Sequence, residues 1–210
     1  MTCGPRRIVA VAVVCALAMT GVGACTEYDK LRKGVDELNH PDDGPPPLTD
    51  QQKIALIDIL RPRGSFETAR ERLTRTAQSI AEQISAAVPG QTWRFADDEN
   101  ERDAYTNGSL CDKLDPDIAR RPRAKTVEFG TPFSTDGFAS ATEIVRSEAA
   151  KYGARTEDSL FNEPAKHDYD VQGDGYEFNL GQIKVATLLI KGDCFLLQKV
   201  IDLPPGRLPA

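Results

Sequence analysis

The strongest constraint on the fold of this chain is an apolar stripe with the spacing of an α-helix, which begins after Ser65. Apolar residues recur there at intervals of three and four, and charged or amide side chains fill the positions between them. The stripe consists of Phe66, Ala69, Leu73, Ala77, Ile80, Ile84 and Ala87. Ser65 is suited to cap the helix, Glu67 lies in its positive first turn, and Val88-Pro89-Gly90 ends it. Because a one-sided helix must bury its apolar face, the rest of the chain has to cover it.

The C-terminal quarter has the pattern of a β-meander. Segments 168–171 and 176–180 flank Gly173-Asp174-Gly175, which is a strong hairpin signal. The second segment alternates apolar and polar residues, so it buries one face. Residues 183–190 become apolar on both faces and predict a central strand, and residues 194–200 predict the strand that follows it.

Shorter elements precede the meander. Segments 91–95, 126–129 and 159–161 have strand character, and Ser134-Thr135-Asp136 offers caps for a second helix that stops at Gly153. The apolar face of that helix consists of Phe138, Ala141, Val145, Ala149 and Tyr152. The pattern therefore predicts an α+β fold in which an antiparallel sheet of about six or seven strands is packed by two amphipathic helices.

Two other segments leave alternatives open. The apolar run 54–60 is too short to separate a strand from a helical turn, and we expect it to dock on the main domain. The acid-rich segment 97–103 suggests calcium, but it lacks the glycine and the final acid of a calcium-binding loop. We interpret it as a solvated loop.

The N-terminus has the parts of a lipoprotein signal peptide. Arg6-Arg7 forms a charged region, residues 8–19 are an apolar run, and Val22-Gly23-Ala24-Cys25 has the form of a lipobox. We expect removal of residues 1–24 and attachment of a diacylglyceryl group to the Cys25 sulfur. Ordinary secretion with a free thiol at Cys25 is the alternative. A permanent spanning helix is disfavoured because it needs about 20 apolar residues.

This processing divides the chain into four parts. After the signal peptide 1–24, residues 25–50 form a tether that starts at the lipidated cysteine and contains the proline-rich stretch 41–47. Residues 51–203 form a single α+β domain, and residues 204–210 form a short tail. We expect the domain to lie at the cell membrane on its extracytoplasmic side.

The cysteine count agrees with export. Cys3 and Cys15 leave with the signal peptide and Cys25 takes the lipid, so Cys111 and Cys194 remain as an even pair in an oxidising compartment. We expect a disulfide between them, and two separate buried thiols are the alternative.

Few side chains offer catalytic or metal chemistry. His40 lies in the tether, which leaves His167 for any imidazole chemistry, and we interpret it as a strand-edge residue with a local hydrogen bond. No nucleophile-elbow or phosphate-loop motif occurs, and a lone histidine cannot build a zinc site. The segment from Asp170 to Gly175 imitates half of a calcium loop, but its twelfth position is Gly181. We expect no cofactor, no metal and no enzymatic activity.

Charge narrows the class of partner. The net charge is −6, which disfavours nucleic acid because phosphate neutralisation needs a basic surface. One basic cluster, Arg120-Arg121-Pro122-Arg123 with Lys125, has the charge to meet an anionic polymer or headgroup. Most clusters of this kind are solvated surface, and we favour that interpretation.

The succession of motifs resembles the actinobacterial, mainly mycobacterial, LppA-like lipoproteins. It covers the lipobox and roughly residues 65–200, and it rests on segments 88–93, 141–145, 152–154, 167–168, 173–175 and 192–194 together with Cys111. The resemblance implies a membrane-anchored envelope protein with lipidated Cys25 and a bridge between Cys111 and Cys194. It supplies no catalytic residues. The proline-rich tether and the paired acids after Trp93 depart from the family pattern, which puts a shared partner surface in doubt.

These features favour a non-enzymatic envelope lipoprotein whose domain binds a partner protein, a wall polymer or a small ligand. A carrier of a lipid or other hydrophobic ligand is the alternative, and it requires a cavity between helices and sheet. An enzyme that uses His167 with nearby carboxylates is the least favoured hypothesis.

The lipobox generates a direct prediction. Cys25→Ala removes the only sulfur that the lipobox presents for acylation, so metabolic labelling with a fatty acid should be lost and the protein should leave the membrane. Labelling and cell fractionation measure both effects. Labelling that persists in the variant would refute the anchor at Cys25.

Overall fold

The computed structural model describes residues 47–163 and 166–209. The chain divides into two compact units, and the described residues belong to the unit that starts at Leu48, apart from Pro47. The expected signal peptide, the lipidated Cys25 and the tether up to residue 46 lie outside the described residues.

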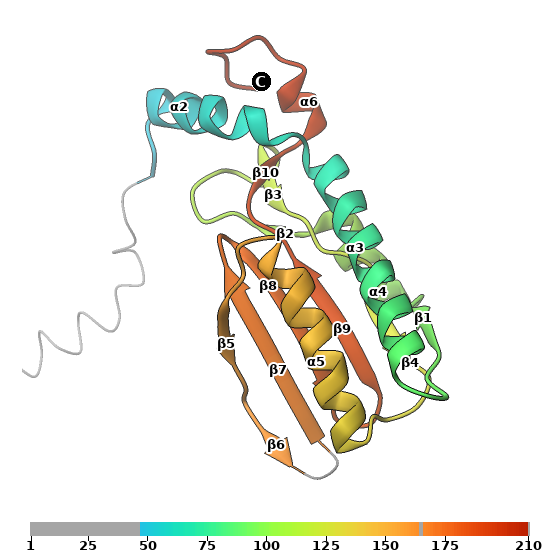
Figure 1. Ribbon diagram of the computed structural model, residues 1–210. Coiled ribbons are helices and arrows are strands. Elements are labelled where there is room, and N and C mark those ends of the chain that lie inside the picture. The colour runs from blue at the N-terminus through green and yellow to red at the C-terminus, as the bar shows by residue number, and fades with distance from the viewer. Residues whose placement is uncertain (1–46, 164–165, 210) are drawn as a thin grey trace, which may run out of the picture. The chain divides into compact units, whose positions relative to one another are not determined.

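A seven-stranded antiparallel sheet forms the centre of the described unit (Figure 1). Its strand order is β1-β4-β9-β8-β7-β5, and β6 also pairs with β7. The strands are β1 Trp93–Phe95, β4 Val127–Phe129, β5 Thr156–Asp158, β6 Asn162–Glu163, β7 Lys166–Gly173, β8 Tyr176–Gln182 and β9 Ala186–Lys191. The α+β class and the antiparallel sheet are confirmed.

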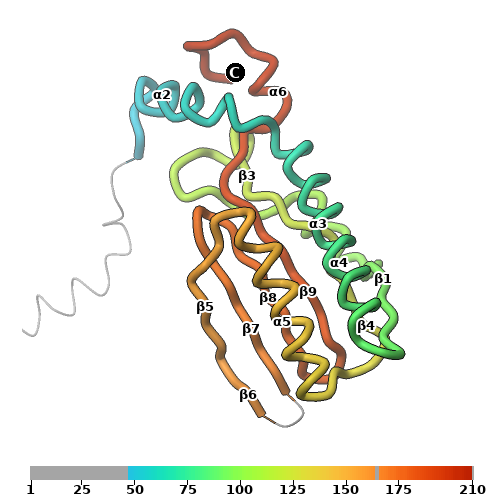
Figure 2. Tube along the Cα trace, in the orientation of Figure 1, coloured from blue at the N-terminus to red at the C-terminus, as the bar shows by residue number. Residues whose placement is uncertain are grey.

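Two helices cover the same face of this sheet. Helix α3 Phe66–Ala87 contacts β9 and β4, and helix α5 Thr135–Ala150 contacts β7 and β8. Figure 2 shows the two helices side by side over the strands. Ser65 caps α3 and Ser134 caps α5, each by accepting a hydrogen bond from a backbone N–H three residues on.

The predicted stripe of α3 is buried, with one exception. Ala87 is exposed, and Ala81 lies in the core in addition to the expected residues. Leu73 and Ile80 are fully buried, as are Phe178, Leu188 and Ile190 on the sheet. The helices and the sheet therefore share one continuous apolar layer.

The β7–β8 hairpin has the predicted tight turn. Asp174 has φ 48° and Gly175 has φ 81°, and Gly173 and Tyr176 are the last paired residues. Two consecutive positive φ values match the right-handed twist of the flanking strands. Glycine is favoured at the second position because it adopts this conformation without a steric penalty.

A second layer lies at one end of the sheet. It contains three helical elements, which are helix α2 Asp50–Leu60, the 3₁₀ turn η1 Arg61–Arg63 and helix α6 Gln198–Ile201. It also contains a small three-stranded sheet of β10 Phe195–Leu196, β3 Ala119–Arg121 and β2 Ser109–Leu110. Ile57, Leu114, Ile118, Leu196 and Val200 form its buried cluster. The run 54–60 is therefore helical, and it docks as expected.

The segment 97–103 is not a loop. Helix α4 Glu99–Asn107 starts within it, and Asp98 caps the helix by accepting a hydrogen bond from the Glu101 N–H at 3.0 Å. Two contacts then hold α4 against its neighbours. The Glu101 carboxylate accepts hydrogen bonds from Arg123 at 2.7 and 2.8 Å, and Arg70 lies 4.6 Å from the centre of the Tyr105 ring. Tertiary ion pairing and packing override an acid-rich composition that suggested solvated coil.

The strand predicted at residues 159–161 was also wrong. Hydrogen bonds between side chains and backbone replace a ladder between this segment and β7: Ser159 Oγ donates to the Asp168 carbonyl at 2.8 Å, and Leu160 N–H donates to Asp168 Oδ2 at 3.0 Å. The segment therefore becomes a connection between β5 and β6, which pair with β7 on either side of it.

Two predicted strands are shorter than expected. The strand predicted at 194–200 reduces to β10, because Val200 and Ile201 pack into the end layer from the short helix α6. The Glu67 carboxylate accepts the Gln198 N–H at 3.0 Å at the start of α6. The strand predicted at 183–190 begins only at Ala186, and Ile183 is 63% exposed in the turn before it.

Cys111 and Cys194 form a disulfide in the structure, with their Cα atoms 5.8 Å apart. They are 83 residues apart in the sequence, so the bridge closes a long loop. It links the start of the segment that carries β3 to the residue just before β10.

This bridge predicts a stability effect. The double variant Cys111→Ala/Cys194→Ala should lose about 2–5 kcal/mol in free energy of unfolding, because the denatured chain regains the freedom of that loop. Urea denaturation with and without a reductant measures the loss. The reductant should destabilise the natural protein to the same extent and leave the double variant unchanged. Two free thiols in the oxidised natural protein would contradict the bridge.

Candidate functional site

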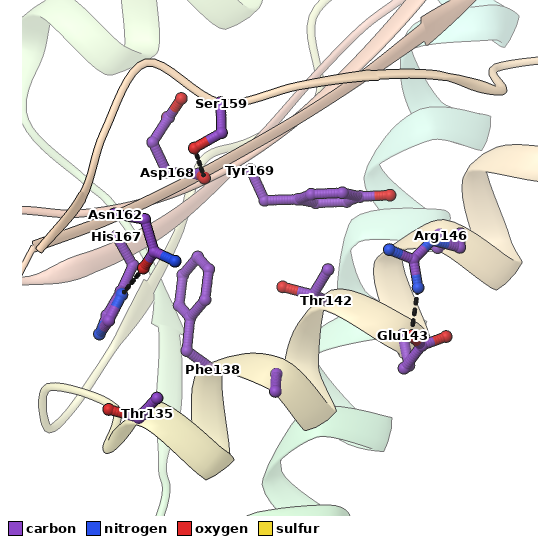
Figure 3. Close-up of a pocket in the computed structure, with 11 residues that line it drawn as sticks. Thr135, Phe138, Thr142, Glu143, Arg146, Ser159, Asn162, His167, Asp168 and Tyr169 are labelled. Atoms are coloured by element: carbon purple, nitrogen blue, oxygen red, sulfur yellow. Dashed lines mark hydrogen bonds and ion pairs between the residues drawn. The ribbon is translucent and has the colours of Figure 1, made fainter.

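A pocket of about 350 Å³ opens between α5 and the segments β5 to β7 at one edge of the sheet (Figure 3). It combines aromatic, hydroxyl, amide and charged side chains. The lining residues are Thr135, Phe138, Ala139, Thr142, Glu143, Arg146, Ser159, Asn162, His167, Asp168 and Tyr169.

Two regular periodicities bring the lining side chains together. Phe138, Thr142 and Arg146 follow one another at intervals of four residues, which places them along one face of α5. His167 and Tyr169 are two residues apart on β7, so both point to the same side of the sheet. The pocket lies where these two faces meet near the edge of the sheet.

His167 is buried, with 2% of its surface exposed. Its Nδ1 lies 2.8 Å from Asn162 Oδ1, and its ring stacks on Phe138 with the ring centres 4.7 Å apart. Asn162 and His167 are register partners in the β6–β7 pair, which fixes this contact. His167 Nε2 is buried and has no hydrogen-bond partner among the described residues. The predicted local hydrogen bond is present.

Ser159 and Asp168 hold in place the connection between β5 and β6, which borders the pocket. Ser159 Oγ also donates to the Phe161 carbonyl at 3.1 Å, and Asp168 Oδ1 accepts from Asn179 Nδ2 at 3.0 Å. Neither side chain is hydrogen-bonded to His167, although all three residue types occur in hydrolase triads. Their hydrogen bonds position the backbone of the segment 159–161 against β7.

Arg146 is the cation of the pocket, and two acids already engage it. Its Nε and Nη2 donate to the two oxygens of Glu157 at 2.7 and 2.8 Å, and Nη1 donates to Glu143. The bonds to Glu157 raise the pKa of Arg146, and in return Arg146 lowers the pKa of Glu157. The guanidinium also lies 5.5 Å from the centre of the Tyr169 ring. The surroundings of the pocket therefore carry more acid than base.

Tyr169 is 6% exposed, and its hydroxyl is buried with no hydrogen-bond partner among the described residues. Burial raises the pKa of Tyr169 to about 12, against the opposing charge of Arg146. Arg146 and Glu157 lie close enough to influence this pKa, but neither makes a hydrogen bond of normal length and angle to the hydroxyl. The phenol therefore stays neutral and protonated at physiological pH.

The other candidate site residues from the sequence do not come together in the structure. Within the described residues, no group of three or more His, Cys, Asp or Glu side chains could hold a metal ion. Asp174 lies in the β7–β8 turn, as the hairpin signal predicted. Cys111 and Cys194 are bridged at the end layer, away from the pocket residues.

The basic cluster is largely engaged within the molecule, which corrects its interpretation as solvated surface. Arg120 donates to the Pro116 and Asn107 carbonyls, and Arg121 donates to the Gly192 and Gly175 carbonyls. Arg123 pairs with Glu101, as described above. Only Lys125 of the charged residues in the cluster is exposed, and it lies over the rings of Phe95 and Tyr105.

Sequence reasoning missed most of the pocket. The four-residue spacing of Phe138, Thr142 and Arg146 was visible, but it indicates only a helix face. Nothing in the sequence says that this face meets Asn162 and Tyr169, because strand pairing across turns sets that meeting.

Comparisons with known proteins give a consistent result. Residues 42–198 match the model of the LppA family, described as a lipoprotein confined to pathogenic Mycobacterium. The chain is 58% identical to LppB of Mycobacterium tuberculosis strain H37Rv over 204 residues, which are 97% of this chain and 87% of that protein. It is 57% identical to LppA of the same strain, over 97% and 88% of the two chains. A crystal structure of LppA from Mycobacterium tuberculosis superposes with a TM-score of 0.75 at 66% identity, covering 76% of this chain and 95% of that one.

The raised pKa of Tyr169 predicts how the free energy of unfolding changes at alkaline pH. The folded state holds the phenolic proton more tightly than the unfolded state, whose pKa is about 10. The stabilisation is therefore complete below about pH 10 and is lost as pH rises through the folded value. Chemical denaturation at several alkaline pH values should show a shallower loss of stability for Tyr169→Phe. Equal slopes for the natural protein and the variant would refute the shift.

Proposed function

Because this chain belongs to the LppA family of mycobacterial lipoproteins, we propose that it is a non-enzymatic binding module held at the extracytoplasmic membrane surface by acylated Cys25. The pocket between α5 and β7 is its binding site. Different observations support the anchor and the recognition site.

The lipobox and the family support the anchor. The match to family members extends over 97% of the chain, and the family is one of lipoproteins. Within the described residues, no helix has the length and apolar character needed to cross a bilayer. Two or more acyl chains on one cysteine suffice for stable attachment, at about 0.8 kcal/mol per buried methylene.

The observation that carries the recognition part is the pattern of hydrogen bonds around the pocket. Ser159, Asp168 and Asn162 are committed to structural bonds, while His167 Nε2 and the Tyr169 hydroxyl are buried without partners among the described residues. A buried polar atom without a partner costs about 1–3 kcal/mol. Groups maintained at such a cost beside a pocket are suited to binding a ligand that pairs with them.

A filled interior favours this module over a hydrophobic carrier. The layer between the two helices and the sheet is occupied by fully buried side chains such as Leu73, Ile84 and Leu180. A carrier needs an apolar cavity at that position. The pocket lies instead at the sheet edge and mixes polar with apolar groups.

The test uses the lipid-anchored protein purified from its own envelope. Ala139 is exposed and lines the pocket, so Ala139→Trp should fill the pocket without disturbing the core. Native mass spectrometry should detect a bound ligand on the natural protein and lose it in this variant. Glu82→Trp, at an exposed position on α3, is the matched control and should retain the ligand. Equal occupancy in the two variants would refute the pocket as the binding site.

A further inference from the structure

We infer that the pocket between α5 and β7 binds an uncharged polyhydroxylated ring, the chemistry of a neutral saccharide unit. The inference rests on the proposed function and names the ligand class for the same pocket. It starts from two polar atoms that the fold buries and leaves unpaired, His167 Nε2 and Tyr169 Oη. Figure 3 shows their rings on either side of Phe138.

His167 Nε2 needs a hydrogen-bond donor. Asn162 Oδ1 is an acceptor 2.8 Å from His167 Nδ1, so Nδ1 carries the ring proton of the neutral imidazole. Nε2 then carries a buried, unpaired lone pair on a residue that lines the pocket. A ligand satisfies it with an O–H or N–H group.

The Tyr169 hydroxyl needs a hydrogen-bond acceptor. Its phenol is protonated, because burial holds the pKa well above neutrality, and its O–H has no partner among the described residues. The oxygen can also accept a hydrogen bond. Satisfying the Nε2 lone pair and the phenolic O–H together therefore requires a ligand that both donates and accepts.

A hydroxyl group meets both demands. An ammonium only donates, so it leaves the Tyr169 O–H without an acceptor, and a carboxylate only accepts, so it leaves His167 Nε2 without a donor. Charge disfavours the anion further, because Glu143 and Glu157 already engage Arg146. An anionic ligand would meet excess negative charge without a free cation among the lining residues.

The shape of the pocket favours a ring over an open-chain polyol. Phe138 and the methyl groups of Ala139 and Thr142 supply an apolar wall on α5, suited to the C–H faces of a sugar. A ring also loses less conformational freedom on binding. A volume of about 350 Å³ is adequate for such a ring. The two unpaired atoms are covered in the structure, so binding includes a side-chain rotation of the kind common at binding sites.

The first test separates binding from stability. Tyr169→Phe removes an unpaired buried hydroxyl, so the melting temperature should rise by about 2–4 °C, while affinity for a neutral glycoside should fall about tenfold. Tyr152→Phe is the matched control, because its hydroxyl lies 2.6 Å from Thr76 Oγ1 and lines no part of this pocket. It should lower the melting temperature and leave affinity unchanged.

The probes are methyl glycosides of glucose, galactose, mannose and arabinose, together with methyl glucuronide and the neutral polysaccharide dextran. They are titrated by saturation-transfer NMR into the full lipidated protein in a sugar-free detergent, up to about 10 mM, since monosaccharide affinities near 1 mM are only about −4 kcal/mol. At least one neutral glycoside should bind more tightly than the glucuronide. Binding of dextran alone would still support the inference and assign the ring to a polymer.

Three results would overturn the inference: no neutral sugar binds, the glucuronide binds as tightly, or Tyr169→Phe leaves affinity unchanged. The proposed function fails separately, when Ala139→Trp and Glu82→Trp retain the native ligand equally. A native ligand that Ala139→Trp displaces, but that no sugar replaces, would end the saccharide inference and leave the binding module standing.

Discussion

Burial of one face of the sheet by α3 and α5 is the constraint on which the rest of this structure depends. Both helices present small and branched side chains to the same face of the sheet, and residues such as Leu73, Val145 and Leu188 have no exposed surface. At about 25 cal/mol per Å² of apolar surface, this layer is the main favourable term for folding. The pocket exists because α5 covers β7 only partly near the sheet edge.

Buried polar groups fix how the ends of that layer are joined. Gln182 is 2% exposed, and its amide bonds the backbone of Phe133 in both directions, at 2.6 and 3.2 Å. This clamp holds the residue just before Ser134, which caps α5. The position of the α5 face relative to β7, and so of the pocket, therefore depends on a hydrogen-bonded core glutamine as well as on apolar packing.

In the end layer, arginine side chains donate hydrogen bonds to backbone carbonyls. Arg61 donates to the Ile201 and Leu203 carbonyls, and Arg121 bonds the Gly192 carbonyl, so arginines tie backbone segments that apolar contacts alone would leave loose. The disulfide of Cys194 acts in the same region. Basic residues that suggested an anion site in the sequence thus have structural roles.

The sequence alone determined the elements whose signal is local, which are the capped α3 stripe and the Asp174-Gly175 hairpin, because periodicity and turn chemistry are short-range. It also identified the α+β class and one pair of cysteines. Only the tertiary structure decided that Glu101 anchors a helix rather than a loop, and that His167 and Tyr169 share a pocket. Those outcomes depend on pairing between segments distant in the chain, where the free energy comes from contacts that no local pattern encodes.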